Sequence, residues 1–285
     1  MSTTRIDATS RALAARLEKS GSESPSLDAS LLLCHILNKP RSYLLTWPEK
    51  ELNASQLTEL EVLANQRELG EPMAYILGFR EFWSLNLKVA KSTLIPRPDT
   101  ERLVELALDK AMELEGDILD LGTGTGAIAL ALASELPHRK VRGIDFQRSA
   151  FELACENRDR LQIHNADFLH GSWFSPLDGG ETFAVITSNP PYIDAQDPHL
   201  SQGDVRFEPL TALVAQDNGL ADIRYIVEHA RRHLAHGGWL LLEHGYQQGE
   251  AVRHILTDFG YHQVTTEQDF ADNDRVTLGQ WHITE

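Results

Sequence analysis

The sequence predicts an α/β protein in which a mostly parallel sheet, covered by helices on both faces, follows a small bundle of helices. Three features of the 285-residue chain support this prediction. Beyond residue 98, short apolar runs alternate with helical segments, as parallel strands and their crossover helices do. Before residue 70, apolar residues recur every three or four positions, which indicates amphipathic helices. Between these parts, residues 75–96 alternate in polarity and carry aromatic side chains, which is typical of a β-hairpin.

The helical part and the hairpin set the expected domain boundaries. Helices are expected at Ile6–Leu17, Leu27–Leu37 and Leu57–Leu69, with breaks between them that contain proline or glycine. The expected division is a helical domain at 1–73, a β-hairpin linker at 74–95 and an α/β domain at 96–285.

The α/β domain contains six candidate strands. We expect strands at Asp117–Leu121, Lys140–Asp145, Thr182–Ser188, Trp239–Glu243, Tyr261–Thr266 and Arg275–Ile283. Helices are expected at Glu101–Leu114, Ala127–Leu136, Arg148–Arg160, Leu220–Ala235 and Gln247–Phe259. The last two strands follow each other without a helix between them, so they can pair antiparallel at one edge of the sheet.

Charge and cysteine content exclude several classes of protein. The formal net charge is −16, and it is concentrated beyond residue 90: residues 1–90 hold 10 Lys+Arg and 11 Asp+Glu, whereas residues 91–285 hold 16 and 31. A direct nucleic-acid substrate is therefore not expected, because such proteins usually carry a basic surface that neutralises phosphates. Cys34 and Cys155 lie apart without neighbouring ligands, so neither a metal site nor a disulfide is expected. The polar amino terminus and the lack of a long apolar run predict a cytoplasmic protein without membrane segments.

A glycine-rich turn follows the first strand of the α/β domain. The segment Gly122-Thr123-Gly124-Thr125-Gly126 can bring backbone N–H groups against a ligand at the start of a helix. Asp145 ends the next strand, where a carboxylate can accept hydrogen bonds from a ribose diol. The same glycines with Ala127 satisfy the dinucleotide pattern, so a nicotinamide dinucleotide is an alternative ligand. Asp120 favours S-adenosylmethionine, because a carboxylate there would repel a pyrophosphate but can pair with an ammonium group.

The tetrapeptide Asn189-Pro190-Pro191-Tyr192 directly follows an apolar strand. Ligands of such sheets bind outside the carboxyl ends of the strands, so this segment is expected to face the glycine-rich turn. The prolines fix an extended backbone. The side-chain oxygen of Asn189 and the carbonyl of Pro190 can then hold both N–H bonds of a planar amino group and aim its nitrogen at a methyl donor, while Tyr192 flanks the group. The predicted catalytic residues are Asn189, Pro190 and Tyr192.

At this point the chain resembles the HemK/PrmC-type methyltransferases, which modify the glutamine of the Gly-Gly-Gln motif in class I peptide chain release factors. The resemblance covers essentially the whole chain. It rests on five segments: IPRPDTE at 95–101, DLGTGTG at 120–126, NPPY at 189–192, GDVRFEP at 203–209 and DRVTLG at 274–279. Asn-Pro-Pro-Tyr also occurs in DNA adenine methyltransferases, so the other segments make the resemblance specific.

The resemblance implies a class I S-adenosylmethionine-dependent methyltransferase fold, with seven strands, and an amino-terminal domain that recognises the substrate. It further implies methylation of glutamine N5 in release factors, which tunes translation termination, with S-adenosylhomocysteine as the other product and no metal. The cofactor contacts it implies are Gly122, Thr123, Gly124, Thr125, Gly126, Asp145, Asp167, Trp173 and Asn189. The substrate contacts it implies are Asn189, Pro190, Pro191 and Tyr192.

Two further segments have expected roles. The family places the PRPDTE segment over the cofactor, although Thr100 also suits the N-cap of the helix that follows. The long irregular segment Ile193–Asn218 is expected to be a lid against the substrate protein, with an internal ion pair between Arg206 and Glu208. Base methylation in DNA or RNA, a nicotinamide oxidoreductase and a non-catalytic module that binds release factors remain as alternatives.

Overall fold

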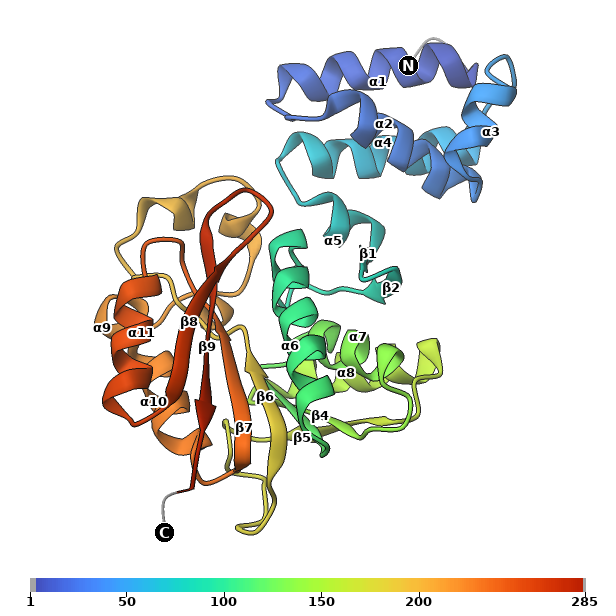
Figure 1. Ribbon diagram of the computed structural model, residues 1–285. Coiled ribbons are helices and arrows are strands. Elements are labelled where there is room, and N and C mark those ends of the chain that lie inside the picture. Colours follow the sequence, from blue (N-terminus) through green and yellow to red (C-terminus); the bar gives the residue numbers. More distant parts are fainter. Residues whose placement is uncertain (1–3, 284–285) are drawn as a thin grey trace. The chain divides into compact units, whose positions relative to one another are not determined.

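The structure, a computed structural model, describes residues 4–283 and divides into two compact units (Figure 1). The smaller unit comprises Met1–Phe79 and Ser201–Phe207, and the larger comprises Arg80–Leu200 and Glu208–Glu285. None of the helices within residues 4–283 is long and apolar enough to cross a membrane.

The smaller unit is helical. It contains α1 (Ile6–Lys19), α2 (Pro25–Leu37), α3 (Arg41–Thr46), α4 (Ala54–Glu68) and α5 (Met73–Leu77). Buried leucines from α1, α2 and α4, including Leu13, Leu32 and Leu60, form its core. The three expected helices are confirmed within a few residues. Helices α3 and α5 were not predicted, because neither contains two full turns of apolar repeat.

A β-hairpin follows, as the alternating pattern predicted. Strands β1 (Phe79–Phe82) and β2 (Leu85–Lys88) pair with each other and are joined by Trp83 and Ser84. Both of these residues have positive φ, 52° and 58°, the backbone that a two-residue turn requires to match the twist of its strands.

The larger unit is built on a seven-stranded sheet (Figure 1). Its strands are β3 (Ile118–Leu121), β4 (Val141–Asp145), β5 (Ala166–His170), β6 (Phe183–Ser188), β7 (Leu234–Glu243), β8 (His262–Gln268) and β9 (Asp274–Trp281). The order across the sheet is β5-β4-β3-β6-β7-β9-β8. All neighbours are parallel except β9, which runs antiparallel to both β7 and β8. The expected antiparallel pairing of the last two strands at one edge is confirmed.

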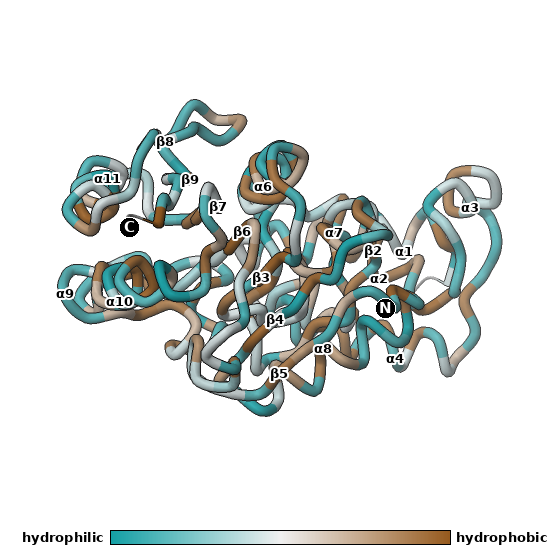
Figure 2. The backbone as a smooth tube through the Cα atoms, turned by 60° about the horizontal axis from the view of Figure 1, so that its bottom comes forward, coloured by the Kyte–Doolittle hydropathy of each residue, from teal (hydrophilic) through white to brown (hydrophobic). Residues whose placement is uncertain are grey.

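Helices cover the two faces of this sheet in two separate core layers. One layer contains apolar residues of α6 (Glu101–Glu113), α7 (Ala127–Glu135) and α8 (Arg148–Leu161), and the other those of α10 (Ala221–Ala230) and α11 (Gly249–Asp258). Hydrophobic stretches follow the central strands (Figure 2). Short helical turns complete the unit: η1 (Pro98–Thr100), η2 (Pro198–Ser201), η3 (Val205–Phe207), η4 (Leu210–Ala212) and α9 (Gln216–Gly219).

Two features of the sheet differ from the apolar pattern. Strand β5 was not among the six strands predicted from that pattern, because it lies at the edge of the sheet and only alternate residues are buried. The helix expected at Leu220–Ala235 ends earlier, at Ala230, because Leu234 already belongs to β7.

The strand order also locates the place for a ligand. Strand β3 lies between β4 and β6, and the connections from these strands cover opposite faces of the sheet. Such a reversal opens a crevice outside the carboxyl ends of the strands.

Candidate active site

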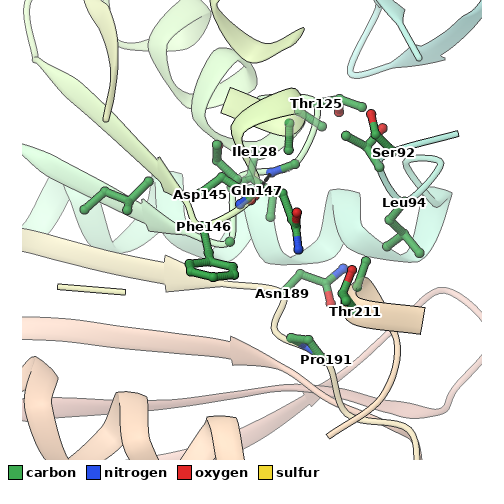
Figure 3. A pocket seen from close by; sticks show the side chains of 18 of the residues that line it. Ser92, Leu94, Thr125, Ile128, Asp145, Phe146, Gln147, Asn189, Pro191 and Thr211 are labelled. Atoms are coloured by element: carbon green, nitrogen blue, oxygen red, sulfur yellow. Dashed lines mark hydrogen bonds between the residues drawn. The ribbon is translucent and has the colours of Figure 1, made fainter. Parts of the chain in front are cut away.

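A cavity of about 350 Å³ opens at the carboxyl ends of β3, β4 and β6 (Figure 3). Its volume is in the range of ordinary small-molecule sites. In Figure 3, Asp145, Phe146 and Gln147 lie on one side of it, and Asn189, Pro191 and Thr211 on the other. The glycine-rich turn therefore shares one cavity with the segment after β6, as the topology of the predicted sheet required.

The glycine-rich turn is stabilised by the side chain of Asp120. Gly122, Gly124 and Gly126 all have positive φ, which glycine adopts without strain. Beneath them, the fully buried carboxylate of Asp120 accepts hydrogen bonds from Thr123 Oγ1 at 2.6 Å and Thr187 Oγ1 at 3.2 Å. Burial raises the pKa of Asp120 to about 7. Asp120 is absent from the cavity lining, so its observed contacts support the turn rather than an ammonium group.

Asp145 connects the turn to the next strand. Its Oδ2 accepts from the N–H of Gly124 at 2.8 Å, and its Oδ1 accepts from the N–H of Gln147 at 2.8 Å. Burial raises the pKa of this carboxyl group, and the two backbone hydrogen bonds oppose that effect. A carboxylate oxygen has two acceptor sites, so Asp145 can still accept from a diol in the cavity. The next residue, Phe146, presents a largely exposed ring to the same space.

The Asn-Pro-Pro-Tyr segment divides into two parts. Asn189 and Pro191 line the cavity, whereas Pro190 is buried and Tyr192 is outside the lining. The Nδ2 of Asn189 donates to Thr100 Oγ1 at 3.3 Å. Tyr192 donates its hydroxyl to Glu243 Oε1 at 3.4 Å, and its expected role beside a substrate amide stays a prediction.

Of the two remaining predicted contacts, one lies in the cavity and one does not. Trp173 lines the cavity, and its ring lies 3.6 Å from where a β-carbon on Gly122 would stand. Asp167 lies outside the cavity, because the register of β5 places it opposite Arg142, three residues before Asp145. Its exposed carboxylate is 3.9 Å from the Arg142 guanidinium. Asp167 is therefore not among the residues that line this cavity, and its expected contact with adenine stays a prediction.

The PRPDTE segment is hydrogen-bonded to the buried carboxylate of Glu208, for which we expected a different partner. Glu208, expected to pair with Arg206, accepts instead from Arg97 at 2.6 Å and from the N–H of Ile95 at 3.0 Å. These contacts hold Pro96 and Thr100 against the cavity. The hydroxyl of Thr100 makes no N-cap hydrogen bond to α6 and meets Asn189 instead.

Glu243 is a residue of the site that we did not single out from the sequence. Its carboxylate is buried at the carboxyl end of β7, beside the residue that follows β6. The sequence could have indicated Glu243 as a site residue, because the predicted strand Trp239–Glu243 ends in a carboxylate, as the predicted strand Lys140–Asp145 does.

The sheet order, the glycine-rich turn and the acid at the end of β4 define a class I methyltransferase. Residues 10–78 match the family described as PrmC N-terminal domain, and residues 99–204 match the methyltransferase small domain. A solved methyltransferase from Pyrococcus furiosus has the same fold, with a TM-score of 0.52 at 18% identity over 81% of this chain and 100% of that chain.

Sequence relatives define the family more narrowly. The release factor glutamine methyltransferase of Vibrio cholerae is 67% identical over 276 residues, covering 97% of this chain and 96% of that protein. The enzyme of the same name from Escherichia coli K12 is 55% identical over 261 residues, covering 92% and 94%. This chain belongs to the family of release factor glutamine methyltransferases.

Proposed function

We propose that this enzyme transfers a methyl group from S-adenosylmethionine to the side-chain amide nitrogen, N5, of the glutamine in the Gly-Gly-Gln motif of class I peptide chain release factors. The modification tunes translation termination. The observation that carries the proposal is the position of Asn189, which enters the same cavity as the glycine-rich turn and Asp145 from the end of a neighbouring strand.

The residues of the cavity fit the proposed cofactor. Asp145 can accept from the ribose hydroxyls, and Gly122, Thr123, Gly124 and Thr125 of the glycine-rich turn line the same space. Phe146 and Ile128 offer apolar surface for a planar base, and Trp173 closes the cavity over Gly122. When bound, S-adenosylmethionine supplies an electrophilic methyl group on a sulfonium centre.

The chain's own residues prepare the nitrogen that receives the methyl group. An amide nitrogen is a weak nucleophile, because its lone pair is delocalised into the carbonyl group. In this proposal Asn189 Oδ1 accepts one of its N–H bonds and the carbonyl oxygen of Pro190, the buried residue between the lining residues Asn189 and Pro191, accepts the other. These two acceptors orient the nitrogen and favour its pyramidal form as positive charge develops. A nitrogen–carbon bond forms as the sulfur–carbon bond breaks, and the nitrogen then loses one proton to water. Alignment of the two reactants contributes much of the acceleration.

The remaining parts of the chain are assigned to the protein substrate. The amino-terminal domain at 1–73 recognises the release factor, the hairpin at 74–95 links it to the catalytic domain at 96–285, and the segment Ile193–Asn218 acts as a lid. The length of this segment, broken only by short helical turns and the four-residue α9, supports that role.

The test is transfer of labelled methyl from S-adenosylmethionine to a purified class I release factor. Two controls accompany it: a factor whose Gly-Gly-Gln glutamine is replaced by alanine, and the enzyme variant Asn189→Ala. We expect label on the intact factor with the unaltered enzyme only. No label on the factor, with the cofactor still bound, would contradict the assigned substrate, and labelling of adenine in DNA or RNA would replace it.

A further inference from the structure

Glu243 is a buried carboxylate that lies beside the segment proposed to hold the substrate amide. In the parallel pairing of β6 and β7, Ser188 is opposite Leu242, so Glu243 follows at the same level as Asn189. The residue is 2% exposed. Only one of its oxygens, Oε1, is satisfied, by the Tyr192 hydroxyl. The other, Oε2, has no hydrogen-bond partner among residues 4–283.

A buried acceptor without a partner is unfavourable, so the second oxygen requires an explanation. The Thr100 hydroxyl lies beside this carboxylate and lowers its pKa, against the larger effect of burial, which raises it to about 7. A threonine hydroxyl can rotate to direct its single hydrogen toward the acceptor that most needs it. The same hydroxyl oxygen receives the Nδ2 hydrogen of Asn189. Glu243, Thr100 and Asn189 therefore form one chain of contacts that ends in the cavity.

The direction of this chain decides which end of the Asn189 amide faces the substrate. An ionised carboxylate can only accept, so Thr100 donates to Glu243 and has only lone pairs left for Asn189. Asn189 must then turn its NH₂ group to Thr100 and leave Oδ1 for the cavity. The two ends of an asparagine amide have nearly the same shape, so hydrogen bonding alone distinguishes them. In the reversed orientation, Asn189 would present an NH₂ donor to the NH₂ group of the substrate.

We propose that Glu243 is a positioning residue that acts through Thr100 to fix the orientation of the Asn189 amide, so that Asn189 Oδ1 accepts the N–H of the substrate. The inference rests on the proposed function, because it assigns the acceptor for a substrate NH₂ group. The chain of contacts consists of Glu243, Thr100 and Asn189, while Tyr192 donates to the Oε1 of Glu243. Arg275 influences Glu243 by its charge, while its guanidinium binds Asp269 at 3.1 Å and lies 3.6 Å from Asp99.

The experiment compares three variants in the full chain: Glu243→Gln, Thr100→Val and Thr100→Ser. Glutamine at 243 keeps the shape but can donate to Thr100, which reverses the direction of the chain. Valine at 100 keeps the shape of threonine and removes the hydroxyl, and serine restores it. We expect kcat to fall on the order of 100-fold in the first two variants, with the affinity for S-adenosylmethionine unchanged and near-normal turnover in Thr100→Ser.

Two further readouts separate positioning from a structural role. The double variant Glu243→Gln with Thr100→Val is expected to lose no more turnover than either single variant, because both break one chain. In the unaltered enzyme, kcat is expected to fall as the pH drops below about 7, because protonated Glu243 can donate to Thr100. In Thr100→Val, kcat is expected not to show this fall. Additive losses, or equal losses of turnover, cofactor affinity and melting temperature, would overturn the proposal.

A measurement without turnover distinguishes this inference from the proposed function. The side-chain ¹⁵N–¹H signals of Asn189 report the partner of its NH₂ group directly. We expect them to shift in both Glu243→Gln and Thr100→Val and to stay in place in Thr100→Ser. Unchanged signals in the first two variants would refute the positioning role even if the enzyme methylates release factors. Shifted signals with no methyl transfer by the unaltered enzyme would refute the proposed function and leave the orientation of Asn189 supported.

Discussion

Asn189 and Asp145 line the same cavity, yet their contacts suit them to different steps. Asp145 is hydrogen-bonded to the glycine-rich turn through Gly124, whereas Asn189 is bonded to Thr100 on the other wall. We expect Asn189→Ala to lower kcat by roughly 100-fold, since it removes an acceptor for the reacting group. We expect Asp145→Ala to weaken cofactor binding by roughly 10- to 100-fold, the size of one or two hydrogen bonds to a charged group. Calorimetric titration with S-adenosylmethionine and steady-state kinetics measure the two effects, and equal losses of cofactor affinity would contradict the division.

Asp120 makes the stability of the chain depend on pH. Because burial raises its pKa in the folded state to about 7, from 3.8, the folded chain holds a proton that the unfolded chain has lost between these values. The stability that this group contributes is therefore complete at low pH and lost as the pH rises through about 7. The whole effect is at most on the order of 4 kcal/mol. We expect Asp120→Asn to flatten the decline of melting temperature between pH 5 and pH 7, relative to the unaltered chain without cofactor. An unchanged slope would show that Asp120 is already ionised in this window.

At the scale of elements, the glycine-rich turn joins β3 to α7, and its glycines differ in the space available for an added β-carbon. A β-carbon on Gly126, which has φ +82°, would lie 3.0 Å from Phe168 Cζ and 3.1 Å from Leu130 Cδ1. A β-carbon on Gly124, which has φ +55°, would meet nothing within 4 Å. Both alanine variants incur about 1 kcal/mol from the left-handed backbone. Gly126→Ala adds roughly 1–3 kcal/mol from overpacking. Urea unfolding of the two variants measures the difference, and equal losses would contradict the packing argument.

The elements that could be predicted from sequence are those whose pattern is complete in one stretch of chain. The strands at Lys140–Asp145 and Thr182–Ser188 each lie within one short stretch of chain, and their carboxyl ends bring Asp145 and Asn189 to the cavity. The residues that were missed depend on partners far away in the chain. Glu208 meets Arg97 across 111 residues, and no local spacing distinguishes Arg97 from Arg206 as its partner. Likewise, the register that removes Asp167 from the cavity follows from a short edge strand with only alternate burial.

At the scale of the whole molecule, the acidic character of the chain is itself informative. The net charge of −16 leaves no general attraction for phosphates, although the cavity could accommodate an exocyclic amine of a base as well as an amide. Discrimination between these planar amino groups therefore falls to the surfaces that bring a substrate to the cavity. This is why the amino-terminal domain, rather than the Asn-Pro-Pro-Tyr segment, is assigned the recognition of a protein.

The division into two compact units gives the last prediction. Every residue that lines the cavity belongs to the larger unit, so S-adenosylmethionine should stabilise that unit alone. At a concentration 100 times its Kd, a ligand adds about 2.7 kcal/mol to the free energy of unfolding. For a domain of this size, that corresponds to an increase in Tm of roughly 5–10 °C.

Hydrogen exchange followed by mass spectrometry should show the protection in β3, β4 and β6 and none in α1, α2 and α4. NAD at the same concentration should protect neither unit, because the cavity lining within residues 4–283 contains Asp145 and Asp222 but no lysine or arginine to pair with a pyrophosphate. Equal protection of both units would show that they unfold together. Protection by NAD would show that the glycine-rich turn binds a dinucleotide.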